Sequence, residues 1–120
     1  MILIIFLMKI KQFDIWIADL NPQMGTETGK IRPVLIVQTD LMMDHPSVVI
    51  CPLTTNIASE SEILRVHLKK GIANLTQDSD IMIDQIRAID KKRLTKKIGE
   101  LPKEMKNNVK ENIKIILDID

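Results

Sequence analysis

Aromatic residues are scarce in this chain. Its 120 residues include two phenylalanines, one tryptophan and no tyrosine. The core must therefore be built from Ile, Leu, Val and Met side chains. Proteins that bind single-stranded nucleic acid usually stack the bases on exposed aromatic rings. Any contact with such a strand is therefore expected to depend on phosphate contacts and hydrogen bonds.

Cysteine and an excess of either charge are also lacking. The only cysteine, Cys51, excludes an intrachain disulfide framework and a zinc cluster, and it favours a reducing, cytoplasmic setting. We interpret it as a buried strand residue rather than a reactive thiol. The net charge of +1 predicts weak, salt-screened attraction to RNA. The basic run at 91–97 and the pair Lys69–Lys70 are interpreted as solvated faces rather than as a phosphate track.

Long hydrophobic runs are absent too. The apolar stretch at residues 1–8 falls well short of the roughly 20 residues that span a bilayer. Lys9 and Lys11 follow this stretch, whereas a secretory signal carries its positive charge in front. We therefore expect no membrane segment. Residues 1–8 are interpreted as an extension from a mis-assigned start, with Met8 as the physiological first residue, and 9–120 as one domain.

The remaining sequence predicts a mostly β fold with a C-terminal α-helix. Strand patterns occur at residues 13–20, 31–38, 48–55, 62–68, 81–89 and 97–101. The fifth is expected to be bulged at Asp84–Gln85, while residues 21–30 predict a mobile loop and 71–80 a connecting loop. From Pro102 an apolar residue recurs every four positions, continuing from Leu101 to Leu117. These elements predict a small, strongly bent sheet or partly open barrel with one packing helix.

The usual catalytic patterns are missing. His45 lies in a turn before a proline and His67 lies late in a strand, so nothing in their spacing brings them together as an acid–base pair. We interpret both as ordinary surface or strand residues. The chain also contains no catalytic-triad order, no phosphate-cradling glycine loop and no metal-ligand spacing. An enzyme with this sequence is therefore expected to need no metal and no cofactor.

The most informative segment is the loop at 25–30, which runs into a strand that starts with Ile31 and Arg32. Its glycines give the loop freedom to move, whereas Arg32 is held by a rigid strand and by the proline after it. The planar guanidinium group matches phosphate oxygens, so this arrangement suits closure over a phosphodiester. The alternative is a structural ion pair between Arg32 and either Asp19 or Glu27.

Four segments, taken in order, resemble the MazF/PemK toxin family. They are residues 14–22 (DIWIADLNP), 25–33 (GTETGKIRP), 52–55 (PLTT) and 84–90 (DQIRAID). Their order and separation match the family from Lys9 to the C-terminus. The resemblance implies an SH3-like, partly open barrel of the CcdB/PemK type that forms a homodimer. It also implies sequence-selective, metal-independent cleavage of single-stranded RNA in the cytoplasm, as an mRNA interferase toxin. A MazE-like antitoxin would neutralise the protein, with operator DNA bound only through the antitoxin complex.

The resemblance also implies roles for individual residues. Arg32 matches the catalytic arginine of such toxins, Thr54 matches the threonine that pairs with it, and Glu27 matches a loop acid that affects activity in some members. The RNA-binding residues implied are Thr26, Thr28, Lys30, Thr55, Asn56, Asp84, Gln85 and Arg87. Some PemK-like members use a loop histidine and an arginine before the aspartate of the fifth strand. Thr26 and Met82 stand there instead, so that acid–base scheme does not transfer.

The implied reaction is attack by the RNA 2′-hydroxyl on the adjacent phosphorus, which leaves a cyclic phosphate and a 5′-hydroxyl. Arg32 suits stabilisation of the phosphorane charge better than acid catalysis, because a guanidinium gives up no proton near neutrality. Thr54 can donate a hydrogen bond to the same phosphate, and Glu27 or the dimer partner can supply a base. Two alternatives stay open: a non-catalytic binding protein on the same barrel, similar to gyrase-poisoning toxins, and an inactive autoregulatory homologue.

Overall fold

The computed structural model describes residues 9–58 and 64–120. The strands are β1 (Asp14–Asp19), β2 (Ile31–Ile36), β3 (Ser47–Thr54), β4 (Arg65–Leu68), β5 (Ser79–Met82), β6 (Arg87–Asp90) and β7 (Leu94–Glu100). Short 3-10 turns are η1 (Asp40–Met42), η2 (Ile72–Asn74), η3 (Ile83–Gln85) and η4 (Lys91–Arg93), and the C-terminal helix is α2 (Lys103–Leu117). The predicted extension at 1–8 and the first two residues of the predicted fourth strand lie outside the described residues. No helix in the described ranges is both long and apolar enough to cross a membrane.

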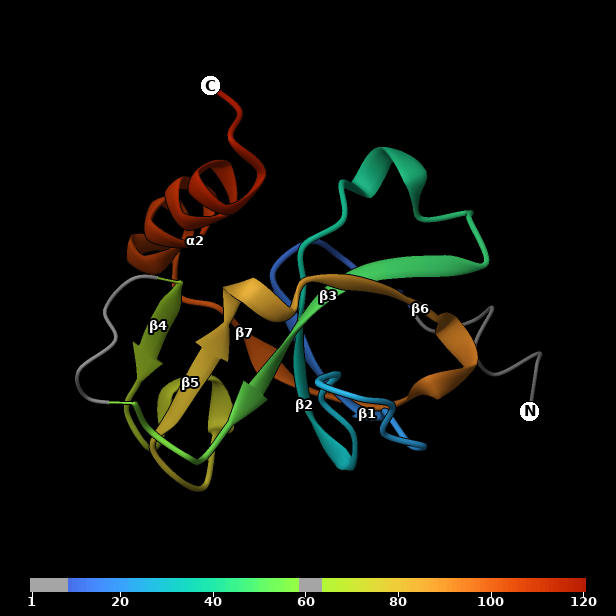
Figure 1. Ribbon diagram of the computed structural model, residues 1–120, viewed down its shortest axis with the longest axis horizontal. Helices are drawn as coiled ribbons and strands as arrows, with labels where there is room; N and C mark the ends of the chain where they lie inside the picture. Colours follow the sequence, from blue (N-terminus) through green and yellow to red (C-terminus); the bar gives the residue numbers. More distant parts are fainter. Residues whose placement is uncertain (1–8, 59–63) are drawn as a thin grey trace.

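Antiparallel pairing joins the strands in the order β4-β5-β3-β2-β1-β7 (Figure 1). β3 organises this sheet because β2 runs along one of its edges, while its other edge pairs with β6 near Ser47 and with β5 near Thr54. The path ends at β4 and β7, so the bent sheet is open. The predicted mostly β class with a C-terminal helix is confirmed.

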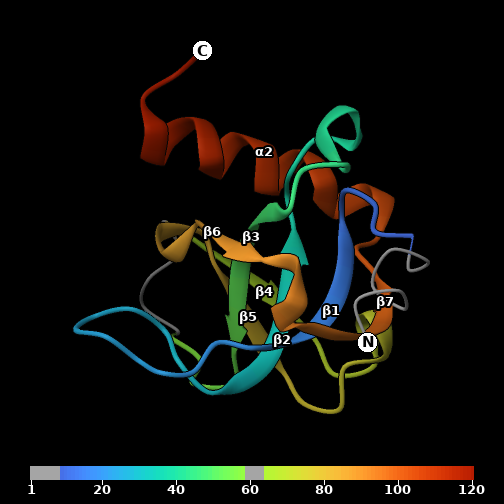
Figure 2. The same ribbon diagram turned by 90° about the vertical axis from the view of Figure 1, so that its right-hand side faces the viewer.

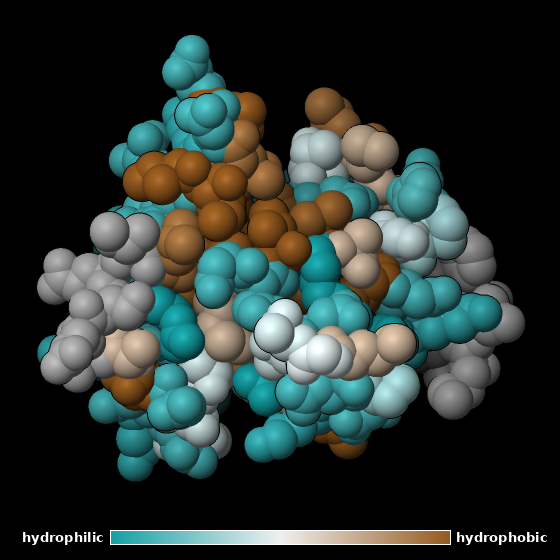
Figure 3. Space-filling view, viewed as in Figure 1, coloured by the Kyte–Doolittle hydropathy of each residue, from teal (hydrophilic) through white to brown (hydrophobic). Residues whose placement is uncertain are grey.

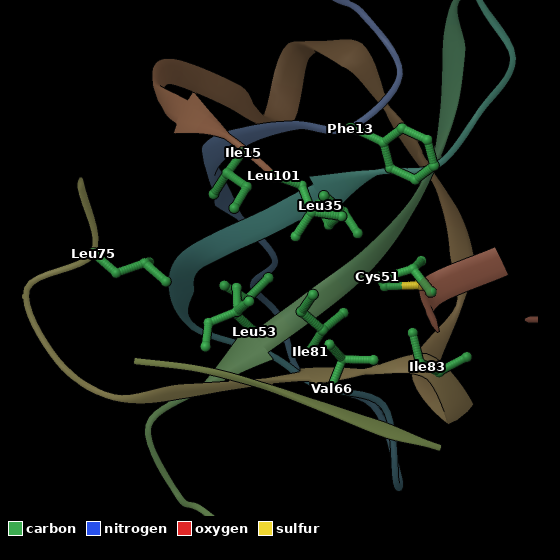
Figure 4. Packing of buried hydrophobic residues seen from close by; sticks show 12 residues of the cluster. Phe13, Ile15, Leu35, Cys51, Leu53, Val66, Leu75, Ile81, Ile83 and Leu101 are labelled. Atoms are coloured by element: carbon green, nitrogen blue, oxygen red, sulfur yellow. The ribbon is translucent and has the colours of Figure 1, made fainter. Parts of the chain in front are cut away.

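Apolar side chains pack on both faces of the sheet. On β1, Ile15 belongs to one buried cluster, whereas Trp16 and Ala18 belong to the other. Cys51 lies among Leu35, Ile81 and the other residues of the first cluster (Figure 4), which confirms its prediction as a buried strand residue. Burying both faces is the way that such a short chain removes enough apolar area from water without large aromatic rings.

The helix α2 lies across one end of the sheet (Figure 2). Val109 is fully buried, and Met105 and Ile113 pack against the same cluster, as the four-residue period predicts. The prediction fails at Leu117, which is 50% exposed because the helix extends past the sheet there. Asn112 is buried instead, and its side-chain oxygen accepts a hydrogen bond of 3.1 Å from the Leu64 backbone N–H, which ties the helix to the start of β4.

Two predicted strand boundaries are wrong. The expected strand at 81–89 is two strands, because η3 interrupts it completely at Ile83–Gln85 where a bulge was expected. β5 then pairs with the end of β3, and β6 with its beginning. The last strand is longer than predicted and begins at Leu94, inside the basic run. The turn η3 matters for the site because its last residue, Gln85, and Arg87 of the following strand both bond the loop at 21–30.

Candidate active site at the ends of β2 and β3

Arg32 is the second residue of β2, and its half-buried side chain is held by two backbone carbonyls. Nε donates to the Gly29 oxygen at 2.9 Å and Nη1 donates to the Leu53 oxygen at 3.2 Å. Partial burial lowers the pKa of the guanidinium from its ordinary value, but an arginine stays charged in proteins. Contacts with the described part of the chain commit two of its five N–H donors, and the other three can bind a ligand.

The expected alternative of an ion pair between Arg32 and Asp19 or Glu27 is wrong. The Asp19 carboxylate accepts a hydrogen bond from the Asn21 backbone, and Glu27 pairs with Arg87. Within residues 9–58 and 64–120, no carboxylate forms a salt bridge with Arg32. Its positive charge is therefore fixed by neutral carbonyl groups and is available to an anion.

Thr54 is the last residue of β3, the strand that pairs with β2. The paired register of the two strands runs from Ile36–Ile50 to Val34–Pro52 and ends two residues short of Arg32 and Thr54. The bond from Arg32 Nη1 to the Leu53 carbonyl brings the guanidinium to the residue before Thr54. The Thr54 hydroxyl oxygen accepts a hydrogen bond of 3.1 Å from the Asn56 backbone N–H. This contact uses a lone pair and leaves the hydroxyl proton available to a bound group.

The loop at 21–30 has no regular structure, as predicted, but it is docked against η3 and β6. The Gln85 side chain accepts from the Thr28 backbone N–H at 3.3 Å and donates to the Thr26 carbonyl at 3.4 Å. The Arg87 guanidinium donates to the Thr28 carbonyl at 3.3 Å. These bonds join segments about 60 positions apart in the sequence and hold the loop beside the strand that carries Arg32.

Glu27 is the acidic residue of this docked loop. Its Oε2 lies 3.7 Å from Arg87 Nη1, and the Glu27 side chain remains 52% exposed. Gly29 allows the tight return of the loop, since a Cβ there would lie 2.6 Å from the Gln23 Cβ. The loop thus presents the carboxyl side chain of Glu27 on a segment that is also tied to Arg32 through the Gly29 carbonyl.

The other predicted RNA-binding residues lie in the loop, directly after β3 and in η3. Lys30, Thr55, Asn56 and Asp84 are exposed, and Lys30 stands two residues before Arg32. Asp84 belongs to η3, and the structure shows no hydrogen bond from its side chain to the loop.

Burial and then the charge of Asp84 raise the pKa of the Cys51 thiol to about 12, so Cys51 is no nucleophile at neutral pH.

One cluster near this centre was missed from the sequence. Asp80 is fully buried, accepts a hydrogen bond of 3.1 Å from the Ala58 backbone N–H and forms a salt bridge of 3.2 Å with Arg65. It also bonds the ring Nδ1 of His67. We expected residues 71–80 to be a loop and His67 to be an ordinary histidine. The alternation at 62–68 that places Arg65 and His67 on one side of a strand was the available signal.

Comparisons with known proteins show which family this chain resembles in sequence and in fold. Residues 11–117 match the family model for PemK-like, MazF-like toxins of type II toxin-antitoxin systems. The chain is 37% identical over 111 residues to the endoribonuclease EndoA of Bacillus subtilis, which covers 92% of this chain and 96% of EndoA. The Mycobacterium tuberculosis toxin MazF-mt6 superposes with a TM-score of 0.75 at 27% identity, covering 89% of this chain and 98% of that one.

A mycobacterial endoribonuclease solved in complex with its cognate antitoxin shares the fold, with a TM-score of 0.76 at 18% identity and coverage of 93% and 98%. The family model spans most of the chain, and it includes every residue of the site described above. The chain therefore belongs to the family of PemK-like, MazF-like toxins of type II toxin-antitoxin systems.

Proposed function

We propose that this protein is an mRNA interferase: a sequence-selective endoribonuclease that cleaves single-stranded RNA without a metal ion. The observation that carries the proposal is the guanidinium of Arg32, which the carbonyls of Gly29 and Leu53 hold at the end of β3 that carries Thr54. Contacts with the described residues use two of its five N–H donors, and the other three can bind a ligand. Such a group is suited to the extra charge that develops on a phosphodiester during cleavage. EndoA, a relative at 37% identity, is named an endoribonuclease.

The proposed reaction uses three side chains. The RNA 2′-oxygen bonds to the adjacent phosphorus while the bond from phosphorus to the 5′-oxygen breaks, which yields a cyclic phosphate and a 5′-hydroxyl. Glu27 takes the proton of the 2′-hydroxyl. Arg32 and the Thr54 hydroxyl donate hydrogen bonds to the phosphorane oxygens, and the departing 5′-oxygen takes a proton from water.

The RNA strand is proposed to lie between the docked loop and the end of β3. The residues assigned to it are Thr26, Thr28, Lys30, Thr55, Asn56, Asp84, Gln85 and Arg87. Gln85 and Arg87 support this assignment because they hold the loop in place through its backbone. Base selectivity would then come from the shape of the groove and the loop contacts.

An antitoxin similar to MazE is the proposed protein partner, and the toxin is proposed to act in the cytoplasm as a homodimer. A structural relative was solved with its cognate antitoxin. Apolar side chains gather over α2 and the adjoining part of the surface (Figure 3), and the exposed apolar residues of that helix are Ile115, Ile116 and Leu117. Contact with operator DNA would occur only through the antitoxin complex.

The decisive experiment compares the wild type, Arg32→Ala and Arg32→Lys on long single-stranded RNA in EDTA. We expect wild-type fragments with 5′-hydroxyl ends. Both variants should lose at least about 100-fold in cleavage rate, because alanine removes the donors and lysine cannot supply a planar fork. Lys103→Ala is the matched control, since it removes an exposed positive charge at the start of α2.

Thermal melting shows whether each variant folds. Intact RNA from folded, antitoxin-free wild type would contradict the proposal and favour a non-catalytic binding protein. Parental cleavage by folded Arg32→Ala would remove Arg32 from the mechanism.

A further inference from the structure

The part of the chain that the structure describes offers almost no exposed ring on which an RNA base can stack. Among the described residues, the aromatic side chains are Phe13, which is 6% exposed, and Trp16, which is 3% exposed, and the chain contains no tyrosine. Histidine is the other side chain with an aromatic ring that stacks on RNA bases. The two histidines, His45 and His67, are therefore the remaining candidates.

His67 lies on the same row of the sheet as Thr54 of the proposed catalytic pair. β5 places Asp80 opposite both Thr54 of β3 and His67 of β4, and the Arg32 guanidinium donates to the carbonyl of Leu53, the residue before Thr54. Since opposed residues share a face, Thr54, Asp80 and His67 form a row across three neighbouring strands, and β2, which carries Arg32, adjoins β3 on its other side (Figure 1). Three strand spacings separate β2 from β4 by roughly 14 Å.

This separation decides what His67 can touch. A single phosphodiester held by Arg32 and Thr54 cannot also reach a residue roughly 14 Å away, so His67 is no acid or base for the same bond. A single-stranded RNA that follows the row would instead bring a neighbouring nucleotide over His67. His45 has no such position, because it precedes Ser47 at the far end of β3, about 23 Å from Thr54.

The ring of His67 is also held rigidly and is open to solvent. Its Nδ1 bonds Asp80, a fully buried carboxylate that Arg65 and the Ala58 backbone N–H fix in turn. The His67 side chain is nevertheless 46% exposed. A ring held in this way loses little conformational freedom when a base packs on it.

We propose that His67 is the stacking platform for one base of the bound RNA, on a nucleotide next to the cleaved one along the β4 side of the sheet. The inference rests on the proposed function for the identity of its ligand. It assigns to β4 a substrate contact and to His67 the role that exposed Phe, Tyr or Trp rings take in other RNA-binding proteins.

The test measures binding of labelled single-stranded 2′-O-methyl RNA, in which the 2′-oxygen is blocked and cleavage cannot occur. Wild type, His67→Ala and the control His45→Ala are compared by fluorescence anisotropy. Loss of one stacked base should weaken binding by roughly 5- to 150-fold in His67→Ala only. The slope of affinity against salt should stay unchanged, whereas loss of a phosphate contact would lower it by about 0.7.

A scan of single abasic sites through the same strand then identifies the stacked base. One abasic position should cost the wild type as much as His67→Ala does and should cost that variant nothing more. Unchanged affinity in folded His67→Ala, a lower salt slope, or equal abasic penalties in both proteins would each overturn the proposal. Failure of wild type to cleave unmodified RNA would contradict the proposed function alone, because the binding assay does not depend on cleavage.

Discussion

Replacement of Glu27 by glutamine separates two roles that the structure allows this residue. The change keeps the size of the side chain but removes its charge and its ability to take a proton. Glu27 pairs with Arg87 at 3.7 Å and is 52% exposed, so the ion pair contributes at most about 1 kcal/mol, or about fivefold. A general base contributes about 100- to 10,000-fold. We expect Glu27→Gln to lower the cleavage rate by at least about 100-fold.

The assay is single-turnover cleavage of an end-labelled RNA at saturating enzyme in EDTA, where the rate reports the chemical step. Arg87→Ala is the matched comparison, since it removes the same ion pair and the hydrogen bond to the Thr28 carbonyl. That variant should bind RNA more weakly, because the loop is less firmly docked, and it should retain most of its rate at saturation.

The double variant, which combines Glu27→Gln with Arg87→Ala, distinguishes the two roles of Glu27. If Glu27 takes the proton, Glu27→Gln lowers the rate by a similar factor in the wild type and in Arg87→Ala. If Glu27 serves only as a partner for Arg87, the double variant cleaves at the rate of Arg87→Ala alone. That second result, or a rate for Glu27→Gln within about fivefold of the wild type, would refute its assignment as the base.

Two further predictions concern stability. A Cβ at Gly99 would lie 2.4 Å from the Ala73 carbonyl oxygen, so Gly99→Ala should lower the free energy of unfolding by about 1–3 kcal/mol. Urea denaturation should show a lower midpoint, while the folded variant cleaves RNA at the parental rate. Although partial desolvation lowers the pKa of Lys97, its bonds to Asp14 and Glu100 outweigh this and raise the pKa overall. Its stabilisation is then complete below about pH 10 and is lost as the pH rises through the folded-state pKa. Lys97→Met should thus lower the free energy of unfolding by about 1–2 kcal/mol at pH 7, at the low end because Lys97 is 39% exposed. Unfolding curves of the wild type and the variant should show this difference in stability shrinking above pH 10. A difference that stays constant with pH would contradict the pairing.

Much of the fold follows from short-range patterns in the sequence. The alternation before Asp19 and the apolar run after Pro33 predict β1 and β2 because period-two burial is a local property. The four-residue period predicts the buried face of α2 for the same reason, up to Val109 and Ile113. Leu117 breaks the pattern because burial also depends on how far the sheet extends, which no local period records.

Long-range pairing accounts for what could not be predicted. The buried carboxylate of Asp14 is satisfied by Trp16 nearby and by Lys97, more than 80 residues away. Asp80 meets His67 only through the register of β4 on β5. Arg32 and Thr54 were identified through their family motifs, and the bond from Arg32 to the Leu53 carbonyl, across two strands about 20 residues apart in sequence, brings the guanidinium to the residue before Thr54.

The break at η3 connects the fold with the site. A continuous strand from 81 to 89 would satisfy the apolar period, but it would pair with only one half of β3. The turn at Ile83–Gln85 lets β5 pair with the end of β3 and β6 with its beginning, and it places Gln85 where its amide bonds the loop. Local departures from an ideal pattern concentrate at functional sites. Here the polar pair that interrupts the strand pattern contributes the side chain that holds Glu27 and its loop beside Arg32.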